Sequence, residues 1–321
     1  MKKSTKIACG IGASAVSAVC FNTVTEFLLG TAFDKEPPRA LGLLTNTLKG
    51  SKPKDDYRSA REAAAEMLSW RESELVEITG DDGTKLRGHL VRCEEPRRLI
   101  IAMHGWRSSW TKDFGLISDF LYDSGCDVLY AEQRAQNGND GYAMGMGMIE
   151  KNDCRRWAGW ANLSYGNSLP VYLYGTSMGA ATVLMASGET LPDNVHGIIA
   201  DSAFTSAKAQ LRHILKDNFH MEYRLRCATA DIISRRKIGM RSDEFTTVEA
   251  LRSNVKPVML IHGTADTFVP MEMFYQNYAA IGGEKEHLII EGAGHCMGYF
   301  IDKDAYEKAL WSFWDKFDDE Q

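Results

Sequence analysis

The sequence predicts a protein of the α/β class, with a mostly parallel, doubly wound sheet of eight strands and a small helical cap. Short apolar runs such as Arg98–Met103 and residues 195–200 alternate with longer amphipathic stretches, which is typical of strands joined by crossover helices. A hairpin comes first, because residues 75–79 and 85–92 flank a Gly-Asp-Asp-Gly turn. We therefore expect an antiparallel pair ahead of the parallel strands.

Each element has a local reason in the sequence. Residues 57–70 place Ala64, Met67 and Leu68 on one face and predict an amphipathic helix. β-Branched and aromatic runs between turn residues predict strands at 75–79, 85–92, 98–103, 127–131, 171–174, 195–200, 257–263 and 286–290. Helices are expected at 114–124, 150–163, 180–186 and 305–317. Residues 204–253 are longer than a plain crossover, and their amphipathic stretches predict the cap.

The predicted site depends on residues 170–181, which read PVYLYGTSMGAA: a buried strand, a G-x-S-x-G turn and a helix in direct succession. A serine on such a tight turn needs a strained backbone, and the flanking glycines remove side chains that would collide there. The hydroxyl of Ser177 would project beside a helix N-terminus, whose dipole favours negative charge. The pattern predicts that Ser177 is a nucleophile.

Two further loops supply partners for this serine. Asp266 follows the predicted strand 257–263, and His295 follows the strand 286–290. The chain order Ser, Asp, His predicts acyl transfer, in which the histidine takes the serine proton and the aspartate holds the imidazole. Alternatives stay open: Asp266 could cap a helix, and His295 could be a solvated loop residue. Asp201 also follows a strand and is a rival for the acid.

The tripeptide His104-Gly105-Trp106 follows the strand Arg98–Met103 and predicts an oxyanion loop. Backbone N–H groups of Trp106 and Met178 would bind the developing oxyanion, and one such donor is worth about 3–4 kcal/mol in the transition state. The predicted substrate pocket is lined by His104, Trp110, Phe204 and Phe268. His104 can instead be structural, and the tryptophan can be a core residue.

Six motifs extend this pattern over residues 75–317: MHGW, EQRAQNGNDG, YGTSMGAAT, ADSAFTS, IHGTADTFVP and GAGHC. As a set they resemble α/β-hydrolase-fold serine hydrolases of the serine-aminopeptidase-like branch, and within it bacterial hydrolases with an N-terminal membrane segment. The resemblance implies the α/β-hydrolase fold and the same three catalytic residues. Gln136 stands where relatives usually have histidine, and Glu132 replaces an aspartate. Because their loop borders the site, we expect these changes to bear on substrate preference.

Composition excludes several classes. The chain has 321 residues and a net charge of −6, with no basic block that would indicate nucleic-acid binding. Of the seven cysteines, the five in the domain show no metal spacing, and free thiols in a reducing compartment are the simplest interpretation. Cys296, next to His295, is either a site of oxidation or a small packing residue.

The N-terminal region predicts a separate segment. Three lysines precede the uncharged apolar run at residues 7–21, so residues 1–31 are a signal-anchor, a cleaved signal or a helix packed on the domain. A signal-anchor would associate with the membrane through residues 7–29 and place the hydrolase outside the cytoplasm; a secreted or cytoplasmic protein is the alternative. Residues 32–74 would be a linker and helix, followed by the catalytic domain at 75–321 with its cap at about 204–253.

These observations predict a serine hydrolase that cleaves an ester, thioester or amide of a small-molecule acyl substrate through an acyl-serine intermediate. A carboxylesterase-like activity is the first expectation, and an aminopeptidase is the alternative. No metal or organic cofactor is required by this chemistry. A non-catalytic binding protein on the same fold would typically lack one of Ser177, Asp266 and His295, and all three are present.

Overall fold

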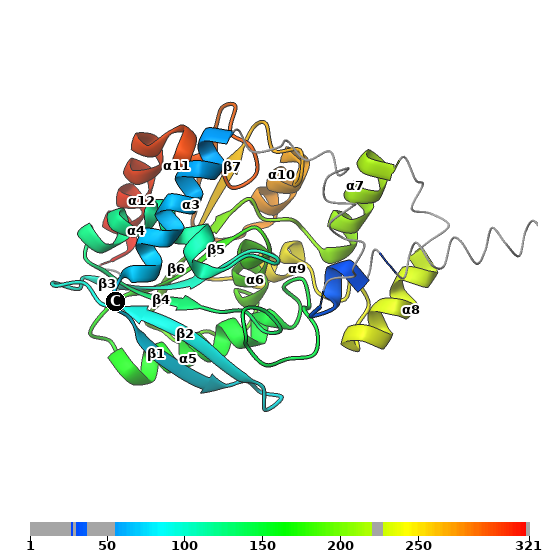
Figure 1. Ribbon diagram of the computed structural model, residues 1–321, viewed down its shortest axis with the longest axis horizontal. Helices are drawn as coiled ribbons and strands as arrows, with labels where there is room; N and C mark the ends of the chain where they lie inside the picture. The colour runs from blue at the N-terminus through cyan, green and yellow to red at the C-terminus, as the bar shows by residue number, and fades with distance from the viewer. Residues whose placement is uncertain (1–26, 28–29, 37–54, 220–226, 319–321) are drawn as a thin grey trace, which may run out of the picture.

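The computed structural model describes residues 27, 30–36, 55–219 and 227–318. Its centre is an eight-stranded sheet with the order β1-β2-β4-β3-β5-β6-β7-β8 (Figure 1). The strands are β1 (Glu74–Thr79), β2 (Lys85–Val91), β3 (Arg98–Met103), β4 (Cys126–Ala131), β5 (Val171–Thr176), β6 (Val195–Asp201), β7 (Val258–Gly263) and β8 (Lys285–Ile290). Strand β2 pairs antiparallel with β1 and β4, and the remaining pairs are parallel. The predicted mostly parallel, eight-stranded sheet is confirmed.

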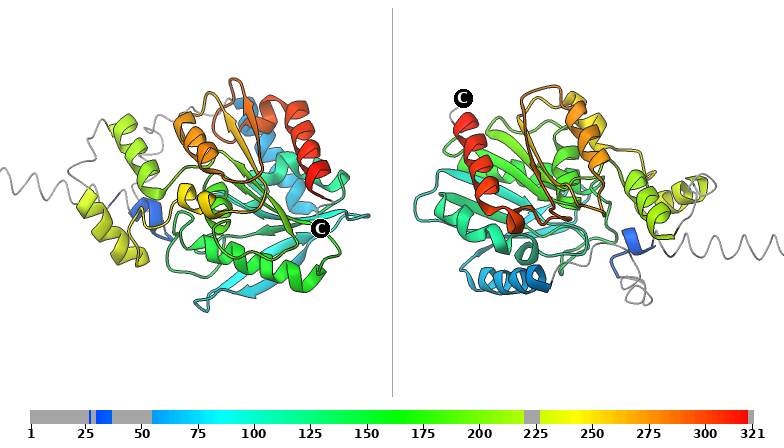
Figure 2. Two further views of the ribbon diagram at one scale, coloured as in Figure 1. Left: turned by 180° about the vertical axis from the view of Figure 1, so that it is seen from behind. Right: turned by 90° about the horizontal axis from the view of Figure 1, so that it is seen from above.

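Helices cover both faces of this sheet (Figures 1 and 2). One face carries α5 (Glu150–Tyr165), α6 (Met178–Ala186), α9 (Thr247–Ser253) and α10 (Met271–Ala280). The other carries α3 (Asp55–Trp70), α4 (Trp110–Asp123), α11 (Gly298–Ile301) and α12 (Lys303–Phe317). Strands β3, β5 and β7 are buried along their whole length, because helices cover both faces of the sheet. This explains why their sequences are continuous rather than alternating apolar runs.

Helix α3 packs closely on α4 and belongs to this covering layer. A Cβ atom on Gly115 of α4 would lie 2.7 Å from the carbonyl carbon of Ala64 in α3, so only glycine permits the approach. Leu68 is buried in the contact, and Arg71 forms a 2.5 Å ion pair with Asp119 beside it. The structure has a helix at the residues 57–70 where one was predicted, and it packs on the sheet's covering layer.

Helices α7 (Ala207–Phe219) and α8 (Cys227–Ile238) lie together at one end of the molecule, beyond α9 and α10 (Figure 1). They share an apolar cluster with Met178, which follows the elbow serine, and with Phe33. Helix α9, inside the range predicted as cap, packs instead on α6 and α10. Residues 220–226 of the predicted cap lie outside the described residues.

The N-terminal prediction requires a correction. Most of residues 7–29 lie outside the described ranges, and within those ranges no helix is long and apolar enough to cross a membrane. A span needs about 20 apolar residues, whereas the described residues 30–33 form a helical turn packed into the protein. Phe33 is fully buried there, and Asp34 pairs with Lys237 at 2.6 Å. The prediction of a single-pass anchor holding the domain outside the cytoplasm is wrong.

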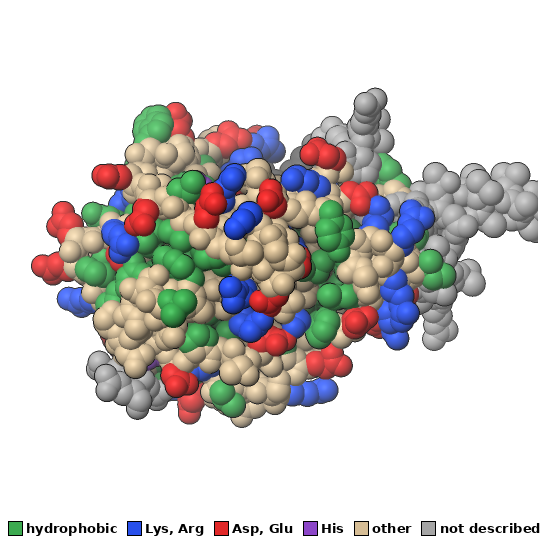
Figure 3. Space-filling model, turned by 90° about the horizontal axis from the view of Figure 1, so that it is seen from below, with side chains coloured by type: hydrophobic (Ala, Val, Ile, Leu, Met, Phe, Trp, Pro, Cys, Tyr) green, Lys and Arg blue, Asp and Glu red, His purple; other side chains and the backbone are tan. Residues whose placement is uncertain are grey.

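Charged side chains of both signs are interspersed over the face of the molecule shown in Figure 3.

Four cysteines in the described part of the chain, at positions 93, 126, 154 and 296, are free thiols. No group of three metal-binding side chains occurs among the described residues.

Candidate active site

Ser177 sits on the turn between β5 and α6 with φ 53° and ψ −114°, a strained conformation for a residue with a side chain. A Cβ atom on Gly175 would lie 2.2 Å from the carbonyl oxygen of Gly179, and one on Gly179 would lie 1.9 Å from that of Met103. The two glycines therefore let strand, turn and helix approach each other closely. The turn is also held by a 2.8 Å bond from the Ser177 N–H to the carbonyl oxygen of Asp201 in β6.

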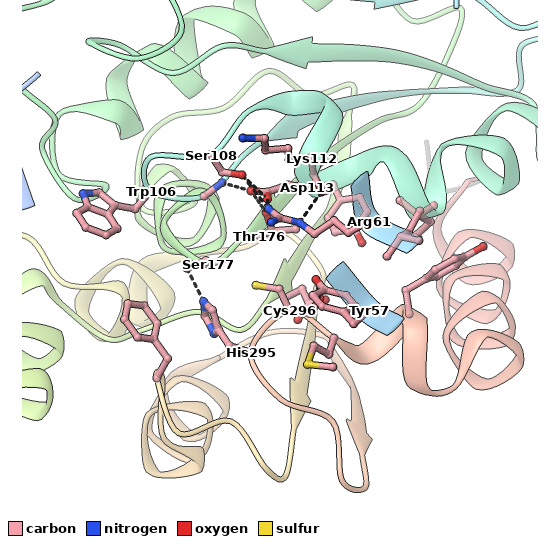
Figure 4. Close-up of a pocket in the computed structure, with 18 of the residues that line it drawn as sticks. Tyr57, Arg61, Trp106, Ser108, Lys112, Asp113, Thr176, Ser177, His295 and Cys296 are labelled. Carbon is pink, nitrogen blue, oxygen red and sulfur yellow. Dashed lines mark hydrogen bonds and ion pairs between the residues drawn. The ribbon is translucent and has the colours of Figure 1, made fainter. Parts of the chain in front are cut away.

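Ser177, His295 and Asp266 form a continuous chain of hydrogen bonds. The distance from His295 Nε2 to Ser177 Oγ is 2.8 Å (Figure 4), and that from His295 Nδ1 to Asp266 Oδ2 is 2.7 Å. The other carboxylate oxygen accepts the N–H groups of Phe268 and Val269 at 2.9 and 2.8 Å. Because a carboxylate only accepts, Nδ1 carries the proton and Nε2 is free to accept the serine proton.

The charges of this chain are mutually stabilised. Burial alone would raise the pKa of Asp266, but the charge of His295 and the hydrogen bonds from His295 and Val269 outweigh it and lower that pKa. Burial would lower the pKa of His295, but the charge of Asp266 and the neighbouring Cys296 raise it well above its ordinary value. Asp266 therefore stabilises the charged imidazole that forms when His295 accepts the serine proton.

Asp201, the rival acid, occupies a different position. Its carboxylate accepts hydrogen bonds from the hydroxyls of Ser202 at 2.8 Å and Tyr306 at 2.9 Å. The Ser202 hydroxyl in turn accepts the N–H of Cys296 at 3.2 Å, so Asp201 acts on the loop of His295 rather than on the imidazole. Burial raises the pKa of Asp201.

Two backbone N–H groups belong to residues beside Ser177: Met178 follows it in the chain, and Trp106 follows Gly105, whose added Cβ would lie 3.2 Å from the Ser177 Cβ. Within the described ranges, the N–H groups of Trp106 and Met178 donate to no other protein group, whereas the N–H of Gly105 is bound by Asp113 at 2.6 Å. Met178 begins α6, so its N–H lies at the positive end of that helix. The pair of unused donors is suited to an oxyanion.

A cavity of about 310 Å³ opens beside Ser177 and extends between α3, α4 and the start of α12 (Figure 4). Its wall is mostly aromatic and apolar, and it includes Tyr57, Tyr174, Tyr299 and Tyr306. It also contains four charged side chains, which are Arg61, Lys112, Asp113 and Asp201.

The residues predicted to line the pocket divide into two sets. Phe268 lines the cavity, with its ring 4.9 Å from that of His295. His104, Trp110 and Phe204 do not line it, which corrects that part of the prediction.

Each of these three has a structural reason. His104 follows β3 and is fully buried. Its imidazole contacts Glu132 at 2.9 Å, in the loop that follows β4, and so does not face the cavity. Trp110 stacks on His89 at 4.6 Å within the core, and Phe204 is buried in the apolar cluster beneath α7.

The loop containing Glu132 and Gln136 contacts the oxyanion loop and not the cavity. Gln136 Oε1 accepts the N–H of Arg107 at 2.6 Å, and Glu132 accepts the Asn137 amide at 2.5 Å as well as binding His104. The expected influence of this loop on substrate preference therefore has no direct contact to support it.

The sequence reasoning missed Tyr57, Arg61, Asp113 and Thr176, all of which line the cavity. The sequence does indicate a place for Asp113 near the site, because this residue lies in the first turn of the helix that directly follows the oxyanion loop. No sequence pattern indicates such a place for Arg61, since the packing of α3 on α4 brings it there.

Fold and site together define a serine hydrolase of the α/β-hydrolase fold, esterase-like or peptidase-like. The model of the prolyl oligopeptidase family matches residues 141–319, more than half of the sequence, and the chain belongs to that family. The predicted α/β-hydrolase resemblance is confirmed at this level, while the N-terminal membrane segment is not supported.

Two bacterial proteins are similar to this chain over about three quarters of its length. The chain is 25% identical over 237 residues to the uncharacterized protein YqkD of Bacillus subtilis, covering 74% of this chain and 77% of that protein. It is 23% identical over 250 residues to the uncharacterized protein YfhR of Escherichia coli, covering 75% and 80%.

Among solved structures, an esterase of Pyrococcus furiosus has a TM-score of 0.62 at 22% identity, covering 78% of this chain and 95% of that chain. The acylaminoacyl peptidase of Pyrococcus horikoshii has a TM-score of 0.56 at 14% identity, covering 78% and 42%. At these identities the two structures support the fold alone.

Proposed function

We propose that the protein hydrolyses esters of small acyl groups through an acyl-enzyme on Ser177, with His295 as general base and Asp266 as its orienting acid. The observation that carries the proposal is the unbroken hydrogen-bond chain from Ser177 Oγ through His295 to Asp266. His295 accepts the serine proton as Oγ attacks the carbonyl carbon, and then donates it to the leaving group. Water then attacks the acyl-enzyme while His295 accepts its proton. The bond to Ser177 Oγ breaks, the serine takes the proton back, and the carboxylic acid is released.

The N–H groups of Trp106 and Met178 bind the oxyanion in both steps. Their hydrogen bonds become stronger as negative charge develops on the carbonyl oxygen. They therefore stabilise the transition state more than the bound substrate, and this lowers the activation barrier. Phe268 and the tyrosines of the cavity would contact the acyl group. The cavity volume of about 310 Å³ favours short or medium acyl chains over long ones.

The experiment is hydrolysis of p-nitrophenyl esters from acetate to palmitate by the full chain, beside Ser177→Ala. We expect turnover that depends on Ser177 and peaks at short or medium chains. A rate for Ser177→Ala equal to that of the wild type would reject the nucleophile, and a maximum at palmitate would reject the cavity as the acyl site.

A second candidate is an aminopeptidase of small peptides or aminoacyl amides. One observation favours it: the Asp201 carboxylate lines the cavity and accepts only hydroxyl hydrogen bonds, with no ion pair among the described residues. The ammonium group of a substrate would supply the missing cation, and Tyr306 would present an aromatic wall beside it. Aminoacyl p-nitroanilides, compared with their N-acetylated forms, test this candidate. Preference for the acetylated form would reject it.

A further inference from the structure

We propose that Asp113 and Arg61 form a clamp that positions the oxyanion loop, here residues 104–108, so that helix α3 supports the geometry of the active site. The proposal deepens the function proposed above and rests on its oxyanion hole at Trp106 and Met178. Neither Asp113 nor Arg61 needs to touch the reacting atoms, so both are positioning residues.

Asp113 binds the oxyanion loop at two points on either side of Trp106. Its Oδ2 atom accepts the N–H of Gly105 at 2.6 Å, and its Oδ1 atom accepts the hydroxyl of Ser108 at 2.5 Å (Figure 4). Oδ2 also accepts the hydroxyl of Thr176 at 3.3 Å, which ties the same carboxylate to the residue before Ser177. One carboxylate therefore links the oxyanion loop to the nucleophile turn.

Arg61 holds this carboxylate in place from α3. Its Nη2 atom lies 2.6 Å from Asp113 Oδ1 and 3.1 Å from Ser108 Oγ, and its Nε atom donates to the carbonyl oxygen of Lys112 at 2.9 Å. Asp113 is only 12% exposed, so an unpaired charge there would be costly. Arg61 contacts the carboxylate through Nη2 alone, and its Nε bond to the Lys112 carbonyl oxygen fixes the planar guanidinium in a way that a mobile ammonium group could not match.

The loop needs such support because its backbone is strained. Arg107 has φ 50°, a region that residues with side chains rarely adopt, and its N–H donates to Gln136 Oε1 at 2.6 Å. Such a conformation persists only where the surroundings impose it. Gly105 and Ser108 donate hydrogen bonds to Asp113, and Arg107 donates one to Gln136. These bonds hold the residues on both sides of Trp106 in the chain and therefore fix the direction of its N–H.

The experiment compares Arg61→Met, Arg61→Lys and Ser108→Ala with the matched control Arg71→Met. Arg71, the residue directly after α3, also forms an ion pair with α4, at 2.5 Å to Asp119, but it has no contact with the oxyanion loop among the described residues. Each full-length variant is measured for thermal unfolding and for kcat and KM on p-nitrophenyl acetate, with Ser177→Ala as the reference for lost chemistry.

We expect Arg61→Met to lower kcat on the order of 10- to 100-fold with little change in KM, because misplaced oxyanion donors act on the transition state alone. Arg61→Lys should recover part of the rate, and Arg71→Met should keep it. Ser108→Ala, which removes one hydroxyl from the clamp, should lower kcat to a smaller extent and provides the test if Arg61→Met does not fold.

A pH profile separates positioning from a general loss of structure. The charged and titratable groups around Asp113 are Arg61 and Tyr57 from α3, Lys112 from its own helix, His104 from the loop, and Cys296. Burial alone would raise the pKa of Asp113. The charge of Arg61 and the hydrogen bonds from Ser108 and Gly105 outweigh this effect, so the pKa is lowered. Without Arg61 the pKa of Asp113 should rise, so kcat of Arg61→Met should show an additional fall toward low pH that Arg71→Met lacks.

Equal kcat values for Arg61→Met and Arg71→Met would overturn the clamp, as would a change confined to KM, which would mean that Arg61 binds substrate. These outcomes differ from failure of the proposed function. If Ser177→Ala keeps its activity, the oxyanion mechanism itself is rejected. If Ser177→Ala is inactive while Arg61→Met is unaffected, only the clamp is rejected.

Discussion

Asp266 and His295 are joined by a 2.7 Å hydrogen bond between Oδ2 and Nδ1, and the Asp266 side chain has no exposed surface. The carboxylate is fully used, since its other oxygen accepts two backbone N–H groups. Such an acid cannot rotate away, and it holds the histidine in the tautomer that general-base catalysis needs.

Asp266→Asn should therefore lower kcat on ester substrates by a factor on the order of 10⁴, because the amide favours the wrong imidazole tautomer. Asp201→Asn is the matched control, as the second buried aspartate at a strand end. It should cost less than about tenfold, since it reaches His295 only through Ser202 and the Cys296 N–H. Steady-state kinetics decides between them, and a larger loss in Asp201→Asn would identify it as the acid.

The activity should rise with pH through the pKa of His295. The base must be neutral to accept the serine proton, and the charge of Asp266 outweighs burial and raises that pKa well above its usual value of 6.5. The acid limb of kcat/KM should therefore lie above pH 6.5. In Asp266→Asn the limb should shift to lower pH while the maximal rate falls. An unshifted limb in this variant would show that another group controls the profile.

Gly179→Ala should destabilise the fold by about 3 kcal/mol or more, because its Cβ would lie 1.9 Å from the Met103 carbonyl oxygen. Gly159→Ala, inside α5, is the matched control: nothing lies within 4 Å of its added Cβ, and it should stabilise by about 0.5–1 kcal/mol. Denaturant unfolding of both variants measures the difference. Equal free energies of unfolding would contradict the close approach of β3 to the elbow.

Phe33→Ala should destabilise the protein by about 3 kcal/mol, since this ring is fully buried in the cluster beneath α7 and α8. Activity should fall as well, because this segment contacts the oxyanion loop. The carbonyl oxygen of Ala32 accepts the Trp106 indole N–H at 3.1 Å, and that of Asp34 accepts an N–H of the Arg107 guanidinium at 2.6 Å. Tyr275→Ala, at an exposed aromatic residue, should change stability by no more than about 0.5 kcal/mol. Thermal unfolding and ester kinetics give both readouts.

Local patterns predicted the sheet and its loops well, and the reason is physical. Strands such as β3 and β5 are continuous apolar runs, and the elbow, the Asp266 loop and the His295 loop each follow a strand. Parallel strands bring their C-terminal ends to one edge, so residues that are distant in the chain meet there without any further information.

The remaining parts of the site depend on tertiary packing. Arg61 meets Asp113 across 52 positions only because α3 packs on α4, and no short pattern encodes that contact. Trp110 was predicted in the pocket because an aromatic residue near the oxyanion loop suits either role. The structure turns it into the core, where it stacks on His89.

The most direct test of the account is to find the residue that carries the covalent intermediate. The full-length protein is incubated with a fluorophosphonate, and the adduct is located by peptide mass spectrometry beside ester kinetics. The account predicts one adduct, on Ser177, that appears as activity disappears and is absent from Ser177→Ala. An adduct on another residue, or ester turnover with Ser177 unlabelled, would contradict it.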